Sequence, residues 1–112
     1  MWFDGPKRTA DQVDPQLRAL VKEMLLITCP NEKRGKSVRP ETRALSRLSE
    51  IDAPTLVMVG DYDVADMSKI ADALATGIPG AKKVVMHGVA HLPNMEQPEE
   101  FNRIVLDFLR TL

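Results

Sequence analysis

Pro54-Thr-Leu-Val-Met-Val-Gly60 is the stretch of the 112-residue sequence that decides the fold class. It is a continuous apolar run, rich in β-branched residues, that ends at a glycine. A half-exposed strand would alternate apolar with polar residues, so this run predicts a strand covered on both faces, as in a parallel sheet. The turn Asp61-Tyr-Asp63 follows, and it would lie at the carboxyl end of that strand.

A helix and a second strand are predicted next along the chain. The helix runs from about Asp66 to Thr76, and Gly77 is placed to end it. Four apolar residues at helical spacing would face inward: Met67, Ile70, Ala71 and Leu74. Lys82-Lys-Val-Val-Met-His87 predicts the second strand. The order strand, helix, strand indicates a right-handed crossover with the two strands parallel.

Helices are also predicted on either side of this unit. Asp14-Pro15 opens a first helix, with the aspartate as its cap, that runs to about Ile27. A short helix from about Glu41 to Leu48 precedes the first strand. After a loop from Gly88 to Gln97, Pro98 opens a last helix whose apolar stripe is the most regular in the chain. That stripe consists of Phe101, Ile104, Val105, Phe108, Leu109 and Leu112.

The segment from Cys29 to Pro40 is polar and contains two prolines and a glycine, so it predicts a loop. It carries four basic residues: Lys33, Arg34, Lys36 and Arg39. They could contact an anion, but we interpret them as a solvated cluster of charges.

Composition and charge narrow the classes of function. The 15 Lys and Arg residues against 16 Asp and Glu leave a net charge of −1, and only 4% of the residues are aromatic. We therefore expect no nucleic acid and no membrane as partners, and no apolar run approaches the ~20 residues of a membrane span. Cys29 is the single cysteine, which excludes an internal disulfide and favours a cytoplasmic location.

Two short parallel strands make a small sheet whose faces and edges need cover. Three helices cover part of this surface, but the unpaired backbone along Leu56–Val59 would still accept another strand. We therefore expect this chain to be one part of a larger sheet, or to receive the missing cover from a partner.

Asp63 and His91 are the residues best placed for catalysis. Each follows the carboxyl end of a predicted strand, and their separation, 91 − 63 = 28 positions, is about what one helix and one returning strand require. The ends of adjacent parallel strands share the rim where α/β proteins bind ligands. There a carboxylate could orient the imidazole as a general base toward a hydroxyl nucleophile. On spacing alone, a turn-forming aspartate and an ordinary loop histidine remain the alternative.

Three stretches resemble the C-terminal part of an α/β hydrolase: Pro54 to Asp63, Ile78-Pro-Gly-Ala81, and Gly88 to Phe101. The resemblance covers about residues 48–112 and is to small esterases, lactonases and haloperoxidase-like hydrolases, including 3-oxoadipate enol-lactonases. It implies Asp63 as the triad acid, His91 as the triad base, no cofactor, and a small-molecule ester or lactone as substrate. Residues 1–47 are similar to the helices and loop of the cap region in the same group.

The chain departs from that family at the nucleophile. The family serine stands in a Gly-x-Ser-x-Gly turn, and no such pattern occurs in this sequence. None of its serines has both flanking glycines: Ser37, Ser46, Ser49 and Ser68. We therefore expect a C-terminal fragment or truncated product that carries the acid and the base and is inactive alone. The alternative is a non-catalytic interaction module that forms a homo-oligomer or docks to a separate N-terminal half.

Other acidic residues compete for the role of the acid. Asp61 is the alternative acid in the same turn. Asp66 is better explained as a helix cap, and Glu96 as an anchor for the His91 loop or a cap for the last helix.

The cysteine, the two histidines and three of the methionines have further possible roles. Cys29 could be a nucleophile, but its neighbours include nothing that would activate the thiol, so we interpret it as buried or idle. His87 and His91 could share a metal on a helix, but Gly88 breaks the helical spacing, and we expect no metal site. Three methionines are expected in the core or lining a pocket: Met58, Met86 and Met95.

Overall fold

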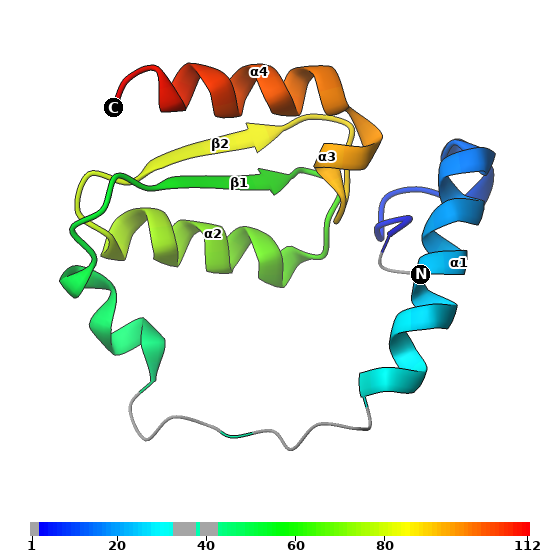
Figure 1. Ribbon diagram of the computed structural model, residues 1–112, viewed down its shortest axis with the longest axis horizontal. Helices are drawn as coiled ribbons and strands as arrows, with labels where there is room; N and C mark the ends of the chain where they lie inside the picture. Colours follow the sequence, from blue (N-terminus) through cyan, green and yellow to red (C-terminus); the bar gives the residue numbers. More distant parts are fainter. Residues whose placement is uncertain (1–2, 33–37, 39–42) are drawn as a thin grey trace.

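The computed structural model describes residues 3–32, 38 and 43–112 (Figure 1). Its elements in chain order are η1 (Ala10–Gln12), α1 (Pro15–Glu32), η2 (Ala44–Glu50), β1 (Leu56–Gly60), α2 (Ala65–Gly77), β2 (Lys82–Met86), α3 (Pro93–Glu96) and α4 (Pro98–Leu109), where η marks a 3₁₀ helix. Among the described residues, no helix has the length and apolar character needed to cross a membrane. The basic residues Lys33, Arg34, Lys36 and Arg39 lie outside the described residues.

The predicted parallel pairing of the two strands is confirmed. Leu56 lies opposite Lys82, and Gly60 lies opposite Met86. The sheet lies between α2 on one face and α4 on the other (Figure 1). On β1, Val57 and Val59 are buried against α2 and the alternate residues Leu56 and Met58 are half-buried, whereas on β2 Met86 is buried and Val85 is 38% exposed.

The opening of the first helix is also confirmed. Asp14 Oδ1 accepts the backbone N–H of Gln16 at 2.8 Å and that of Leu17 at 3.3 Å, which satisfies donors that have no partner within the helix. The predicted end at Ile27 is wrong, because α1 continues through Pro30 to Glu32. The φ angle fixed by a proline is close to the helical value, and in the last turn its missing N–H removes only one backbone hydrogen bond.

Within the part of the chain that the structure describes, two separate hydrophobic clusters hold the fold together. Val57, Val59 and Ala71 join β1 to α2. Phe3, Val13 and Val21 form the second cluster, with Leu92 and Met95 of the α3 region packed against it. The second cluster therefore attaches the N-terminal segment and α1 to the loop that follows β2, beyond the carboxyl ends of the strands (Figure 1).

Helix α2 differs from the prediction at two positions. Ile70 is 45% exposed, so it is not part of the inward face that Ala71, Met67 and Leu74 form. Gly77 is the last helical residue rather than a left-handed cap, since its φ is not positive. A Cβ atom at Gly77 would lie 2.6 Å from Leu48 Cδ1 and 2.9 Å from Leu48 Cβ, so a side chain there would require Leu48 of η2 to shift.

The remaining boundaries shift for local reasons. The predicted loop from Gly88 to Gln97 contains the short helix α3, which opens at Pro93. The last helix ends at Leu109, so Leu112 of the predicted stripe lies beyond it. The predicted helix from Glu41 to Leu48 is the 3₁₀ helix η2 from Ala44, and its first two positions lie outside the described residues.

Candidate active site

The turns that follow β1 and β2 are joined by backbone hydrogen bonds. Asp61 N–H donates to Met86 O at 3.0 Å, and Tyr62 N–H donates to Val89 O at 3.0 Å. These bonds extend the contact between the strands past their ends. They place residues 61–63 directly beside the loop that carries His91.

Gly60 allows this close approach. A Cβ atom at this position would lie 2.3 Å from Val89 O and 2.4 Å from Ala90 O, distances that real Cβ atoms do not show. The last position of β1 therefore accepts only a residue without a side chain. The apolar run ends at glycine because the second turn crosses it there.

Asp63 and His91 meet at this rim. His91 Nδ1 lies 2.8 Å from Asp63 Oδ2, and the other carboxylate oxygen, Oδ1, accepts the N–H of Val64 at 2.7 Å. The Asp63 side chain is 6% exposed and the His91 side chain is 32% exposed. Each oxygen of the buried Asp63 carboxylate thus has a hydrogen-bond partner. One of these oxygens holds the His91 ring at Nδ1, and the His91 side chain is partly accessible to solvent.

A cavity of about 270 Å³ opens beside this pair. Its lining includes Asp63, His91, Met58, Met67 and Phe101. A larger space of about 550 Å³ lies between β2 and α4, but neither Asp63 nor His91 lines it. We therefore associate the smaller, more apolar cavity with the pair.

Asp61 binds the other histidine. Its Oδ2 lies 3.0 Å from His87 Nδ1, and its Oδ1 accepts the N–H of Gly88 at 2.8 Å. Burial alone would raise the pKa of the Asp61 carboxyl, but the hydrogen bonds from His87 and Gly88 lower it below its ordinary value. The His87 side chain is 85% exposed, so this second pair joins the two turns at the surface of the protein.

Glu96 anchors the His91 loop, as predicted. Its Oε1 accepts the N–H of Ala90 at 2.8 Å. Its other oxygen, Oε2, contacts Arg8 Nη1 at 2.5 Å, in an ion pair whose side chains are 8% and 6% exposed. Arg8 was not predicted from the sequence, because no periodic pattern connects two residues 88 positions apart.

The structure also places the other residues considered from the sequence. Asp66 is not a cap: it lies in the first turn of α2 and pairs with Lys69 on the surface. Cys29 is exposed, so the expectation of a buried thiol is wrong. Met86 is buried, whereas Met58 lines the cavity and Met95 packs on the N-terminal cluster. No group of three potential metal ligands occurs among the residues described.

Comparison with known proteins gives a consistent set of relatives, although no protein-family model matches the chain. A hydrolase of Pseudomonas putida, a 2-hydroxy-6-oxononadienedioate/2-hydroxy-6-oxononatrienedioate hydrolase, is 42% identical over 65 residues, which are 58% of this chain and 23% of the relative. A putative 2-succinyl-6-hydroxy-2,4-cyclohexadiene-1-carboxylate synthase of Bacillus subtilis is 24% identical over 98% of this chain and 40% of its own length.

The chain also superposes on part of several solved structures. MenH from S. aureus superposes with a TM-score of 0.60 and 33% identity, over 62% of this chain and 26% of that protein. Est816, an N-acyl homoserine lactone degrading enzyme, superposes with a TM-score of 0.55 and 41% identity, over 57% of this chain and 25% of its own. The chain spans less than a quarter of the length of the P. putida relative, and about a quarter of these two structures.

Proposed function

The homologues of this chain are α/β hydrolases that it matches over their C-terminal part, and from that premise we propose that it supplies the acid and the base of a Ser-His-Asp triad. The supporting observation is the 2.8 Å contact between His91 Nδ1 and Asp63 Oδ2 at the carboxyl ends of two adjacent parallel strands. The proposed reaction is hydrolysis of a carboxylic ester or a lactone, in line with the lactone-degrading activity described for one structural relative.

The proposed roles follow from the chemistry of the imidazole ring. If Nδ1–H donates to Asp63, then Nε2 carries the lone pair and can take a proton from a hydroxyl nucleophile. The oxygen of that nucleophile then attacks the substrate carbonyl, and His91 returns the proton to the departing alkoxide. In the second step His91 removes a proton from water, and the water oxygen attacks the carbonyl of the acyl group now bound to the nucleophile. The bond between that carbonyl and the nucleophile oxygen breaks, the acid leaves, and His91 returns the proton to the nucleophile oxygen. The Asp63 carboxylate stabilises the imidazolium that forms in each step.

The nucleophile in this proposal comes from outside the chain. The sequence lacks the Gly-x-Ser-x-Gly turn, and the serines at described positions lie in η2 or α2: Ser46, Ser49 and Ser68. Neither element has the sharp turn after a strand that projects a nucleophilic hydroxyl. We therefore infer that the hydroxyl group that His91 would activate belongs to a Gly-x-Ser-x-Gly turn outside this sequence.

We also assign residues 1–47 to the cap region and residues 48–112 to the hydrolase core. The separation of the two hydrophobic clusters supports this division, since Phe3, Val13 and Val21 pack apart from Val57 and Val59. A purely structural interaction module would not require a buried carboxylate bonded to a partly exposed imidazole, so the geometry favours the hydrolytic role.

Hydrolysis of p-nitrophenyl acetate by the isolated chain tests the claim about the nucleophile. The unmodified chain and His91→Ala should both remain near the rate of the buffer alone, because neither contains an activated hydroxyl. Turnover at a rate typical of esterases, lost in His91→Ala, would show that the chain has its own nucleophile.

A further inference from the structure

Arg8 and Glu96 form a buried ion pair between the N-terminal segment and the loop that carries His91. The Glu96 carboxylate is divided between two donors, with Oε2 at 2.5 Å from Arg8 Nη1 and Oε1 accepting the N–H of Ala90 at 2.8 Å. Ala90 directly precedes His91, so its amide fixes the backbone from which the imidazole extends. One carboxylate thus connects Arg8 to the position of the proposed base.

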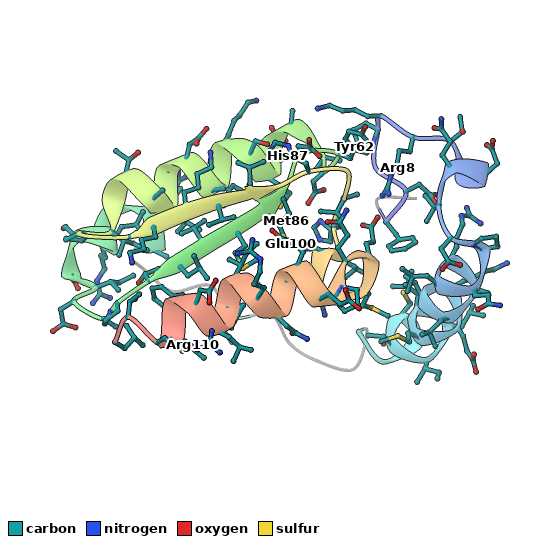
Figure 2. All side chains as sticks on the ribbon, turned by 90° about the horizontal axis from the view of Figure 1, so that it is seen from above. Arg8, Tyr62, Met86, His87, Glu100 and Arg110 are labelled. Atoms are coloured by element: carbon teal, nitrogen blue, oxygen red, sulfur yellow. The ribbon has the colours of Figure 1, made fainter. Side chains whose placement is uncertain are left out.

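All three guanidinium nitrogens of Arg8 donate hydrogen bonds. Nε donates to Asp4 O at 2.8 Å, Nη2 donates to Phe3 O at 3.1 Å, and Nη1 also lies 3.5 Å from Gly88 O. Its Cζ atom lies 5.6 Å from the centre of the Tyr62 ring, on the turn after β1 (Figure 2). Arg8 therefore contacts the N-terminal segment and both turns of the rim.

The same connection continues to α1. The carboxylate of Asp4 accepts Arg18 Nε at 2.8 Å and Nη2 at 3.4 Å, so α1 is attached to the short segment whose carbonyl groups hold Arg8. Gly5 permits this docking: its φ is +77°, and a Cβ atom there would lie 2.2 Å from Tyr62 O. The N-terminal segment is thus seated tightly against the rim.

We propose that Arg8 and Glu96 are positioning residues for His91, which hold the Ala90–His91 backbone so that Nδ1 stays within hydrogen-bond distance of Asp63. This role rests on the proposed function of His91 as the base. Removing the charge of Arg8 or of Glu96 leaves the remaining charge buried with no opposite charge beside it. The loop that carries His91 can reduce this energetic cost by moving toward solvent. A displacement of the imidazole by about 1 Å is enough to lose productive geometry in a catalytic site.

The test measures the protonation of each histidine ring separately, because His87 and His91 are the only two histidines in the sequence. Long-range ¹H–¹⁵N correlation at pH about 8, where an ordinary imidazole is neutral, reports which ring nitrogen carries the proton. In the unmodified chain, we expect His91 to be protonated on Nδ1. In Arg8→Met, we expect His91 to lose about half of that population and the Ala90 amide to exchange about tenfold faster, while His87 keeps its spectrum.

Conservative and control variants separate positioning from general loss of structure. Arg8→Lys should restore part of the Nδ1–H population, and Arg103→Met, which removes an exposed ion pair with Glu100 on α4, should change neither readout. If Arg8→Met does not fold, Glu96→Gln gives the same comparison, since it removes the charge and keeps an oxygen for Ala90.

Two results would count against this role in different ways. Folded Arg8→Met and Glu96→Gln proteins with unchanged His91 and Ala90 signals would overturn the positioning role and leave the proposed function standing. Protonation of His91 on Nε2 in the unmodified chain would overturn both.

Discussion

Asp61 and Asp63 are two positions apart, yet their surroundings differ. Each bonds a histidine through Nδ1, at 3.0 and 2.8 Å, but the Asp63 side chain is 6% exposed and the Asp61 side chain 29%. Only the Asp63 pair borders the apolar cavity. The exposed pair is therefore a natural control for the buried one.

This contrast predicts different effects of the same substitution. In a chimera, the 65 matching residues of this chain replace their counterparts in the P. putida hydrolase. In our proposal, the remaining part of that relative supplies the nucleophile. Asp63→Asn in that chimera should lower kcat by about 10⁴-fold, because the amide favours the wrong imidazole tautomer. Asp61→Asn should lower kcat less than about tenfold. Comparable losses of kcat in steady-state assays of the two variants would contradict the assignment.

Asp4 predicts a pH-dependent contribution to stability. The hydrogen bond from Arg18 lowers the pKa of the Asp4 carboxyl, although burial opposes this. Because the folded pKa is below the unfolded value of about 3.9, the stabilisation is complete above that pH and is lost as the pH falls through the folded pKa. Asp4→Asn should therefore cost about 2 kcal/mol at neutral pH and much less at pH about 2.

Urea unfolding of both proteins at the two pH values measures this difference. A free-energy gap that stays the same at low pH would show that Asp4 stabilises the fold through something other than its charge.

At the scale of elements, the parallel strands and the helix between them follow from local pattern. The run Leu56–Gly60 is apolar throughout, and the spacing of Met67, Ala71 and Leu74 marks one helical face, so neighbouring residues were enough to identify both. The approach of Asp63 to His91 followed from strand order, because the ends of adjacent parallel strands share a rim.

Other features depend on contacts between distant segments, and sequence pattern does not report these. Arg8 contacts Glu96, which is 88 positions away in the sequence, and a side chain at Gly77 would lie too close to the Leu48 side chain of η2. The α3 turn forms within a stretch too short for a periodic signal, and its Met95 packs on a cluster made by the N-terminal segment.

Gly60 tests how closely the two turns must approach. Gly60→Ala places a methyl group against Val89 O and Ala90 O, so the His91 loop must move, at a cost of about 1–3 kcal/mol in unfolding free energy. Gly80→Ala is the control: nothing lies within 4 Å of its Cβ position, and its φ of +72° adds a backbone cost of about 1–2 kcal/mol.

Amide chemical shifts separate the two variants even where their stabilities are similar. Residues 88–91 should shift in Gly60→Ala and stay in place in Gly80→Ala. Unchanged shifts in both would mean that β1 and the loop are not in tight contact.

At the scale of the whole molecule, the chain is more open than its mass requires. The accessible surface is 8343 Å², whereas a compact monomer of 12.5 kDa exposes about 6,200 Å². The radius of gyration is 16.2 Å, compared with about 13 Å for a compact domain of this length. Large apolar side chains on α1 and α4 account for part of this surface, among them Leu20, Met24, Leu106 and Leu109.

This open structure predicts that the free energy of unfolding depends only weakly on urea concentration. The slope of unfolding free energy against urea concentration scales with the surface that unfolding exposes, and this chain has less buried surface to expose. Its slope should therefore be lower than that of a compact protein of equal length. A slope equal to that of the compact control, measured by circular dichroism, would indicate that the isolated chain closes around a fuller core.

The most direct measurement is p-nitrophenyl acetate hydrolysis by the P. putida chimera and by the same chimera with His91→Ala. If the imidazole held by Asp63 is the base, the chimera hydrolyses the ester and the substitution lowers kcat by about three to four orders of magnitude. Equal rates for the two folded proteins, whether high or at the level of buffer, would contradict the assignment.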